Sequence, residues 1–213
     1  MYSKTLNYNH PTISIWLLFA LNVGICFSKQ YPMQLYEINN SDSLLILADE
    51  IVINKTNKSF GNGKHFRVYG QIKAPINEVF NIINKEEEYP KFMPRFNDVK
   101  YLYTENDFSY YTFHITLPLN IKYQYKIKIN EHQNKDVAWI TWELVDWEHN
   151  SIADTWGQWY FTSLNNSEYT LIQYQTYIDP GYVPFGAGWI VDLLTHTSLP
   201  QIVKNSKEYI EGK

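Results

Sequence analysis

The C-terminal half of this chain contains many strand-like runs and only one long helix-like run. Six runs rich in β-branched and aromatic residues occupy 99–106, 108–119, 121–130, 136–147, 154–164 and 168–178. Polar or turn-forming residues separate them, which is typical of an antiparallel sheet with short connections. After the last run, helical spacing of apolar residues predicts a helix over 188–210, with a kink at Pro200.

The run at 121–130 shows how the sheet must be covered. Its side chains alternate between an apolar face with Tyr123, Tyr125, Ile127 and Ile129 and a polar face with Gln124, Lys126, Lys128 and Asn130. Such alternation predicts a sheet with one dry face and one wet face. Because the terminal helix is the only sizeable cover, we expect a curved sheet wrapped around it, with a cavity where the two do not meet.

The segment before these strands supplies a hairpin and two helices. Residues 50–55 and 65–73 read as strands joined by a glycine-containing turn. We predict a short helix over 41–49 capped by Ser41, and a second helix opened by Pro75. The acidic run 86–88 is interpreted as a solvated helix end.

The N-terminus is expected to lie outside the fold. The apolar run 13–27 has the length of a signal-peptide core, and cleavage after Ser28 would follow a small-x-small pattern. We therefore predict a signal peptide over 1–28, a linker over 29–42 and one domain over 43–213. The protein would be exported, to a periplasm or outside the cell; an uncleaved N-terminal membrane anchor is the alternative.

Charge and motifs argue against several functions. The net charge of −4 lacks the basic excess of a nucleic-acid-binding protein. The six histidines show no paired metal spacing, and no phosphate-binding glycine loop occurs, so we predict neither metal nor cofactor. The acids Asp146, Glu148 and Asp154 read either as an acid/base cluster or, preferably, as a solvated turn. His114 should face solvent unless the strand register is shifted by one residue.

Four runs, in order, resemble the START and polyketide-cyclase-like superfamily. They are KAPINEVFNIINKEEEYPKFMPRFNDVKYL, AWITWELV, DTWGQWYFTSL and YIDPGYVPFGAGWIVDLLTHTSLPQIVKNSKEYI. The resemblance covers about residues 43–211 and implies an α+β helix-grip fold that holds a hydrophobic ligand such as a sterol, phospholipid or fatty acid. Two features depart from the pattern: Tyr182 replaces the second glycine of a usual pair, and the Arg-Asp pair of animal START domains is missing after Phe113.

Alternation and the family pattern together predict which residues line the cavity. The predicted ligand-binding residues are Phe113, Ile115, Tyr123, Tyr125, Ile127, Trp142, Trp159, Phe161, Tyr182, Phe185, Trp189 and Leu193. On the 136–147 strand both faces carry tryptophan, and the face with Ile140, Trp142 and Leu144 is the more consistently apolar. The alternative is that these residues pack on the helix as plain core.

The connection YIDPGYVPFGAGW, residues 177–189, carries more apolar surface than a turn needs. It is interpreted as a hinged flap over the cavity mouth, with transient membrane contact through 179–188; a static loop packed on the core is the alternative.

Three functions remain open at this level. The first is an exported protein that binds a lipid or other hydrophobic molecule in its cavity, either only to hold it or also to transfer it between membranes. The second is a cyclase or dehydratase, which an inward His114 or a buried acid with a raised pKa would favour. The third is a protein-interaction module of the same superfamily.

Overall fold

The computed structural model describes residues 37–55, 63–117, 120–164, 167–181 and 198–212. By its internal contacts, Met33–Lys213 forms one compact unit. The predicted signal peptide lies outside the described residues. Among the described residues, no helix has the length and apolar character needed to cross a membrane.

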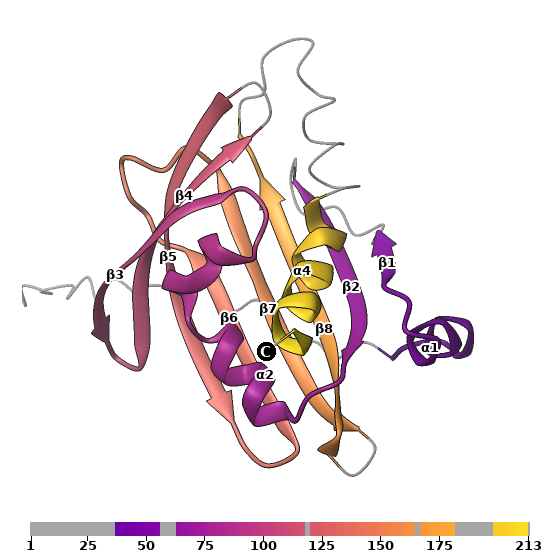
Figure 1. Cartoon of the computed structure of the whole chain (residues 1–213). Coiled ribbons are helices and arrows are strands. Elements are labelled where there is room, and N and C mark those ends of the chain that lie inside the picture. The colour runs from indigo at the N-terminus through magenta and orange to yellow at the C-terminus, as the bar shows by residue number, and fades with distance from the viewer. Residues whose placement is uncertain (1–36, 56–62, 118–119, 165–166, 182–197, 213) are drawn as a thin grey trace, which may run out of the picture. The chain divides into compact units, whose positions relative to one another are not determined.

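In the described ranges, this unit is built on one antiparallel sheet of eight strands, which confirms the predicted α+β class. The strands are β1 (Val52–Lys55), β2 (Lys64–Ile72), β3 (Phe96–Glu105), β4 (Phe108–Leu117), β5 (Ile121–Gln133), β6 (Val137–Leu144), β7 (Asp154–Leu164) and β8 (Tyr169–Asp179). Their order across the sheet is β1-β2-β8-β7-β6-β5-β4-β3, so the N-terminal hairpin joins the last strand. Figure 1 shows the sheet bending around helices on one face.

Two α-helices and a 3₁₀ helix cover that face. The α-helices are α2 (Ile76–Ile83), which follows Pro75 as predicted, and α4 (Leu199–Glu211). Pro200 lies in the first turn of α4, where proline is tolerated, and the predicted helical residues 188–197 lie outside the described ranges. Ile202 and Val203 of α4 belong to the same buried cluster as the inward residues of the sheet.

The alternation of side chains on β5 and β6 shows which face of the sheet carries the core. Ile127 and Ile129 of β5 are buried in the main cluster, while Lys126 lies over the rings of two tyrosines on the outer face. On β6, Ile140 is buried and Trp142 and Leu144 pack against the core. Trp139 instead stacks on His132, at 5.6 Å between ring centroids. The structure thus selects the face that the sequence left undecided.

A fourth helix, α1 (Asn40–Leu47), covers the opposite face of β2. Tyr69 of β2 is only 1% exposed because it packs with Ile46 of α1 and Val52 of β1. The predicted cap is wrong. Asn39 caps the helix, and its Oδ1 accepts hydrogen bonds from the Asp42 backbone N–H at 2.8 Å and from the Ser41 hydroxyl at 2.6 Å. The helix therefore begins inside the predicted linker.

The acidic run also differs from the prediction. Residues Glu86–Lys91 form a 3₁₀ helix, η1, instead of the predicted solvated helix end. With three residues per turn, Glu86 and Tyr89 fall on the same side, and both are buried. Glu87 is exposed. Local periodicity thus brings one carboxylate of the three into the protein.

Candidate functional site

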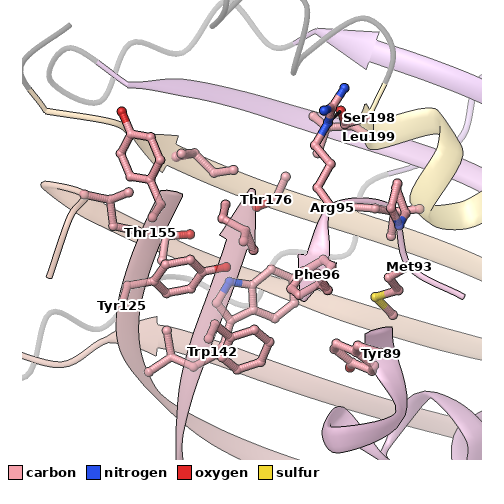
Figure 2. A pocket seen from close by; sticks show the side chains of 18 of the residues that line it. Tyr89, Met93, Arg95, Phe96, Tyr125, Trp142, Thr155, Thr176, Ser198 and Leu199 are labelled. Atoms are coloured by element: carbon pink, nitrogen blue, oxygen red, sulfur yellow. Dashed lines mark hydrogen bonds between the residues drawn. The ribbon is translucent and has the colours of Figure 1, made fainter. Parts of the chain in front are cut away.

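An apolar cavity of about 150 Å³ lies between the sheet and the first residues of α4. Strands β3 to β8 and the segment after η1 all contribute to its wall. Figure 2 shows Tyr125 and Trp142 on one side of the cavity, Met93 and Tyr89 on another, and Ser198 and Leu199 of α4 above.

Seven of the twelve predicted ligand-binding residues line this cavity. They are Phe113, Ile115, Tyr123, Tyr125, Ile127, Trp142 and Trp159. Their aromatic rings form a connected wall: Phe113 stacks on Tyr125 at 5.6 Å between centroids, and Trp159 meets Tyr174 at 4.4 Å.

Phe161 does not belong to this lining. It lies on the inner face of β7 like Trp159, but two residues further along the strand, where α2 covers the sheet. Its ring meets Phe80 of α2 edge-on at 6.3 Å between centroids, and it is completely buried as core. The remaining predictions, Tyr182, Phe185, Trp189 and Leu193, lie outside the described residues.

Gly157 makes room for the wall. It pairs with Trp142 across β6 and β7. A Cβ added at this glycine would collide with the Trp142 ring and with the carbonyl oxygen of Gln175. Gly157, in the run DTWGQWYFTSL, therefore permits the Trp142 ring to pack closely against the sheet, next to Tyr174 at 5.7 Å between ring centroids.

Several lining residues were not predicted. They include Tyr89 of η1, Met93, Pro94 and Arg95 from the segment between η1 and β3, Phe96 of β3, Thr155 of β7, and Tyr174, Thr176 and Ile178 of β8. The β8 residues alternate along the strand, so the same periodicity used for β5 could have found them. The segment 92–95 after η1 has no such signal, because Pro94 interrupts regular structure.

Tyrosine and threonine hydroxyl groups supply polar atoms to the wall of the cavity. The Tyr89 hydroxyl donates to the Ile83 carbonyl at 2.8 Å, and the Thr155 hydroxyl donates to the Tyr177 carbonyl at 2.9 Å. Burial raises the pKa of Tyr125 and Tyr174 well above the usual tyrosine value. Both phenols are therefore neutral at physiological pH and can act as hydrogen-bond donors to a ligand.

Arg95 is the only lysine, arginine, histidine or acid among the described residues that line the cavity. Its backbone has φ 70°, in the left-handed region, and its Nε donates to the Ser198 hydroxyl at 2.7 Å. Within the described part of the chain, its guanidinium has no carboxylate partner. The hydrogen bond between Arg95 and Ser198 joins the segment after η1 to the start of α4 at the edge of the cavity.

The other candidate chemical groups lie elsewhere. His114 faces away from the cavity, with Nδ1 at 3.7 Å from Asp98 Oδ2 and a side chain that is 37% exposed. Asp146 and Glu148 are exposed in the turn after β6, as a solvated turn predicts. In the described ranges, no three His, Cys, Asp or Glu side chains converge closely enough to hold a metal ion.

Comparison with known proteins supports the fold. No family model and no curated protein matches this sequence. Among solved structures, a STAR-related lipid transfer protein from Xanthomonas axonopodis is 15% identical, with a TM-score of 0.62 over 75% of this chain and 93% of that one. Human StAR-related lipid transfer protein 5 is 11% identical, with a TM-score of 0.65 over 76% and 82% of the two chains.

An enzyme shares the same architecture. The Zhui aromatase/cyclase from Streptomyces sp. R1128 is 12% identical, with a TM-score of 0.58 over 70% of this chain and 94% of that one. The chain therefore has the helix-grip fold of the START and polyketide-cyclase-like proteins, as its sequence motifs predicted. At such identities the similarity establishes the fold alone, because this fold serves both carriers and enzymes.

Proposed function

We propose that this protein binds a hydrophobic small molecule, such as a lipid, in the cavity between the sheet and α4. The observation that carries the proposal is the lining, which is aromatic and aliphatic apart from a few hydroxyl groups and Arg95. Transfer of apolar ligand surface from water into such a site is favourable by about 25 cal/mol per Å². The structural similarity to lipid transfer proteins agrees with this proposal.

The cavity volume limits what fits without rearrangement. An apolar cavity of about 150 Å³ accommodates a molecule the size of benzene. A complete lipid therefore requires lining side chains to move apart. In this proposal the aromatic wall holds the apolar part of the ligand, while Arg95 and the Tyr125 hydroxyl hydrogen-bond to an oxygen atom of its polar end.

The lining favours a binder over a cyclase or dehydratase. Proton transfer within the cavity would need a carboxylate or an imidazole near the substrate. The described lining residues include neither, and His114 faces the other way. Among the residues that the structure describes, Glu86 is the one buried acid with a raised pKa, and it does not line this cavity.

We also propose that the chain is exported and that residues 179–188 contact a membrane during ligand exchange. Export rests on the apolar run 13–27, and membrane contact rests on the apolar side chains of the connection after β8. Mass determination of the protein isolated from its native cells would test export, because cleavage after Ser28 removes a defined mass. An intact N-terminus would indicate the membrane anchor instead.

Native mass spectrometry of the full-length chain, followed by organic extraction, tests ligand binding. We expect an additional mass that the extract identifies as a hydrophobic molecule. The Ile115→Trp variant places a larger ring in the cavity and should lose that mass while it keeps the circular dichroism spectrum of the wild type.

Ile53→Trp provides the matched control, because Ile53 is 43% exposed on β1 and does not line the cavity. It should retain the ligand. A wild-type protein that carries no ligand and takes none up from lipid vesicles would overturn the proposal, and so would equal ligand loss in both variants.

A further inference from the structure

A second pocket, of about 420 Å³, lies at the β3–β4 hairpin and is here called the hairpin pocket. It is lined by Asn84, Glu86, Thr104, Asp107, Ser109, Tyr111, Ile129, Asn130 and Glu131. Only Ile129 among these residues also lines the apolar cavity. The two sites therefore differ in chemistry, because the hairpin pocket is formed mostly by oxygen-bearing side chains.

Glu86 contributes a buried carboxylate to the hairpin pocket. Its side chain is 3% exposed, and Oε1 has no hydrogen-bond partner in the described structure. An unsatisfied buried polar atom is costly, and it is costlier when it belongs to a charged group. Glu131 and Glu87 lie close enough to disfavour a negative charge on Glu86 further. The Tyr111 hydroxyl hydrogen-bonds to the Glu86 carboxyl, but no lysine, arginine or histidine of the described residues is among the groups that shift the pKa of Glu86.

The residues around the opening add negative charge. Asp107 and Glu131 are both exposed, and no Lys, Arg or His is among the residues that line the pocket. The hairpin turn is held in place: Asn106 and Asp107 have φ 48° and 64°, and the Asn130 side-chain amide donates to the Asp107 carbonyl at 2.9 Å. Three carboxylates, those of Glu86 in η1, Asp107 in the hairpin turn and Glu131 in β5, therefore surround one polar space.

The spacing of these carboxylates distinguishes between kinds of cation. Calcium or magnesium would need several oxygen ligands to converge on one point. No group of three acidic, histidine or cysteine side chains in the described ranges converges in this way. A ligand with several separated positive charges matches three separated carboxylates better than a single ion does.

We propose that the hairpin pocket binds a linear organic polyamine, with one ammonium group against Glu86 and another at the opening near Asp107 or Glu131. An ammonium group offers three donors, and one of them would satisfy the unpartnered Oε1 of Glu86. The apolar Ile129 would contact a methylene segment between the charges.

Isothermal titration calorimetry of the full-length chain with spermidine, at low ionic strength and pH 8, tests the proposal. We expect saturable binding with one site, and binding of the monoamine butylamine at least about tenfold weaker because it offers a single charge. Glu86→Gln keeps the shape of the side chain and removes its charge, so it should weaken spermidine binding by about tenfold or more.

Glu78→Gln is the matched control, because Glu78 is an exposed acid of α2 that does not line the pocket. It should bind spermidine like the wild type. Equal weakening in the two variants would show attraction by net charge only and would overturn the site. Calcium binding that is tighter than spermidine binding and depends on Glu86 would overturn the assignment of a polyamine as the ligand. The absence of saturable spermidine binding would overturn both the site and its ligand.

Discussion

The pKa of Glu86 makes the stability of this protein depend on pH in a predictable direction. Burial raises that pKa from 4.5 to about 7, and the nearby charges of Glu131 and Glu87 act in the same direction. The other titratable groups that face Glu86 are Tyr111 and Tyr89, whose hydroxyls are neutral in this range. The folded protein therefore holds a proton between about pH 4.5 and 7 that the unfolded chain releases.

The sign follows from proton linkage. The free energy of unfolding decreases with rising pH wherever the folded state binds more protons than the unfolded state. It should therefore decrease as pH rises through this interval and level off above about pH 7. A shift from 4.5 to about 7 corresponds to about 3 kcal/mol, at about 1.4 kcal/mol per pKa unit. This is a large part of the stability of a typical domain.

Urea denaturation of the wild type and of Glu86→Gln at pH 5, 6, 7 and 8 measures the effect. We expect the variant to gain stability relative to the wild type as pH rises, by up to about 3 kcal/mol at pH 8. Glu78→Gln should follow the wild-type profile, because its side chain is exposed. Parallel profiles for the wild type and Glu86→Gln would refute the reasoning, since they would mean that Glu86 is ionised in the folded state throughout.

Two further substitutions test packing and capping. Gly157→Ala should lower the free energy of unfolding by about 1–3 kcal/mol in urea denaturation, because the added methyl collides with the Trp142 ring and the Gln175 carbonyl oxygen. An unchanged midpoint would show that both the ring and the backbone of β8 can shift. Asn39→Ala should cost about 1 kcal/mol, because the Asp42 backbone N–H loses its acceptor. Asn39→Ser should restore most of that stability, and no recovery would contradict a capping role.

The antiparallel sheet could be predicted because the alternation on each strand is local information. The period of two on β5 predicted that Tyr123 and Tyr125 share the apolar face, and both line the cavity. Their side chains point to one face wherever the strand is placed, so only the cover had to be inferred. On β6 the same period left the choice of face open, because Trp139 and Trp142 lie on opposite faces.

Other parts depend on contacts between distant segments. Phe161 has the same alternation as Trp159, but the position of α2 decides which of them meets the cavity. Glu86 is one of three adjacent glutamates, and nothing in its immediate sequence separates it from Glu87. Its burial depends on the 3₁₀ turn and on β4 and β5 above it. The burial of Tyr69 likewise depends on where α1 lies.

The strand order has a consequence for synthesis of the chain. Strands β3 to β8 can pair with their neighbours as each leaves the ribosome, because consecutive strands are adjacent in the sheet. β2 pairs with β8, however, with Ile72 opposite Thr170 and Lys64 opposite Ile178. At about 5–20 residues per second, the N-terminal hairpin waits on the order of 5–20 s for that partner. During this interval one edge of β2 has no strand beside it, and any factor that protects the nascent chain must cover it until β8 emerges.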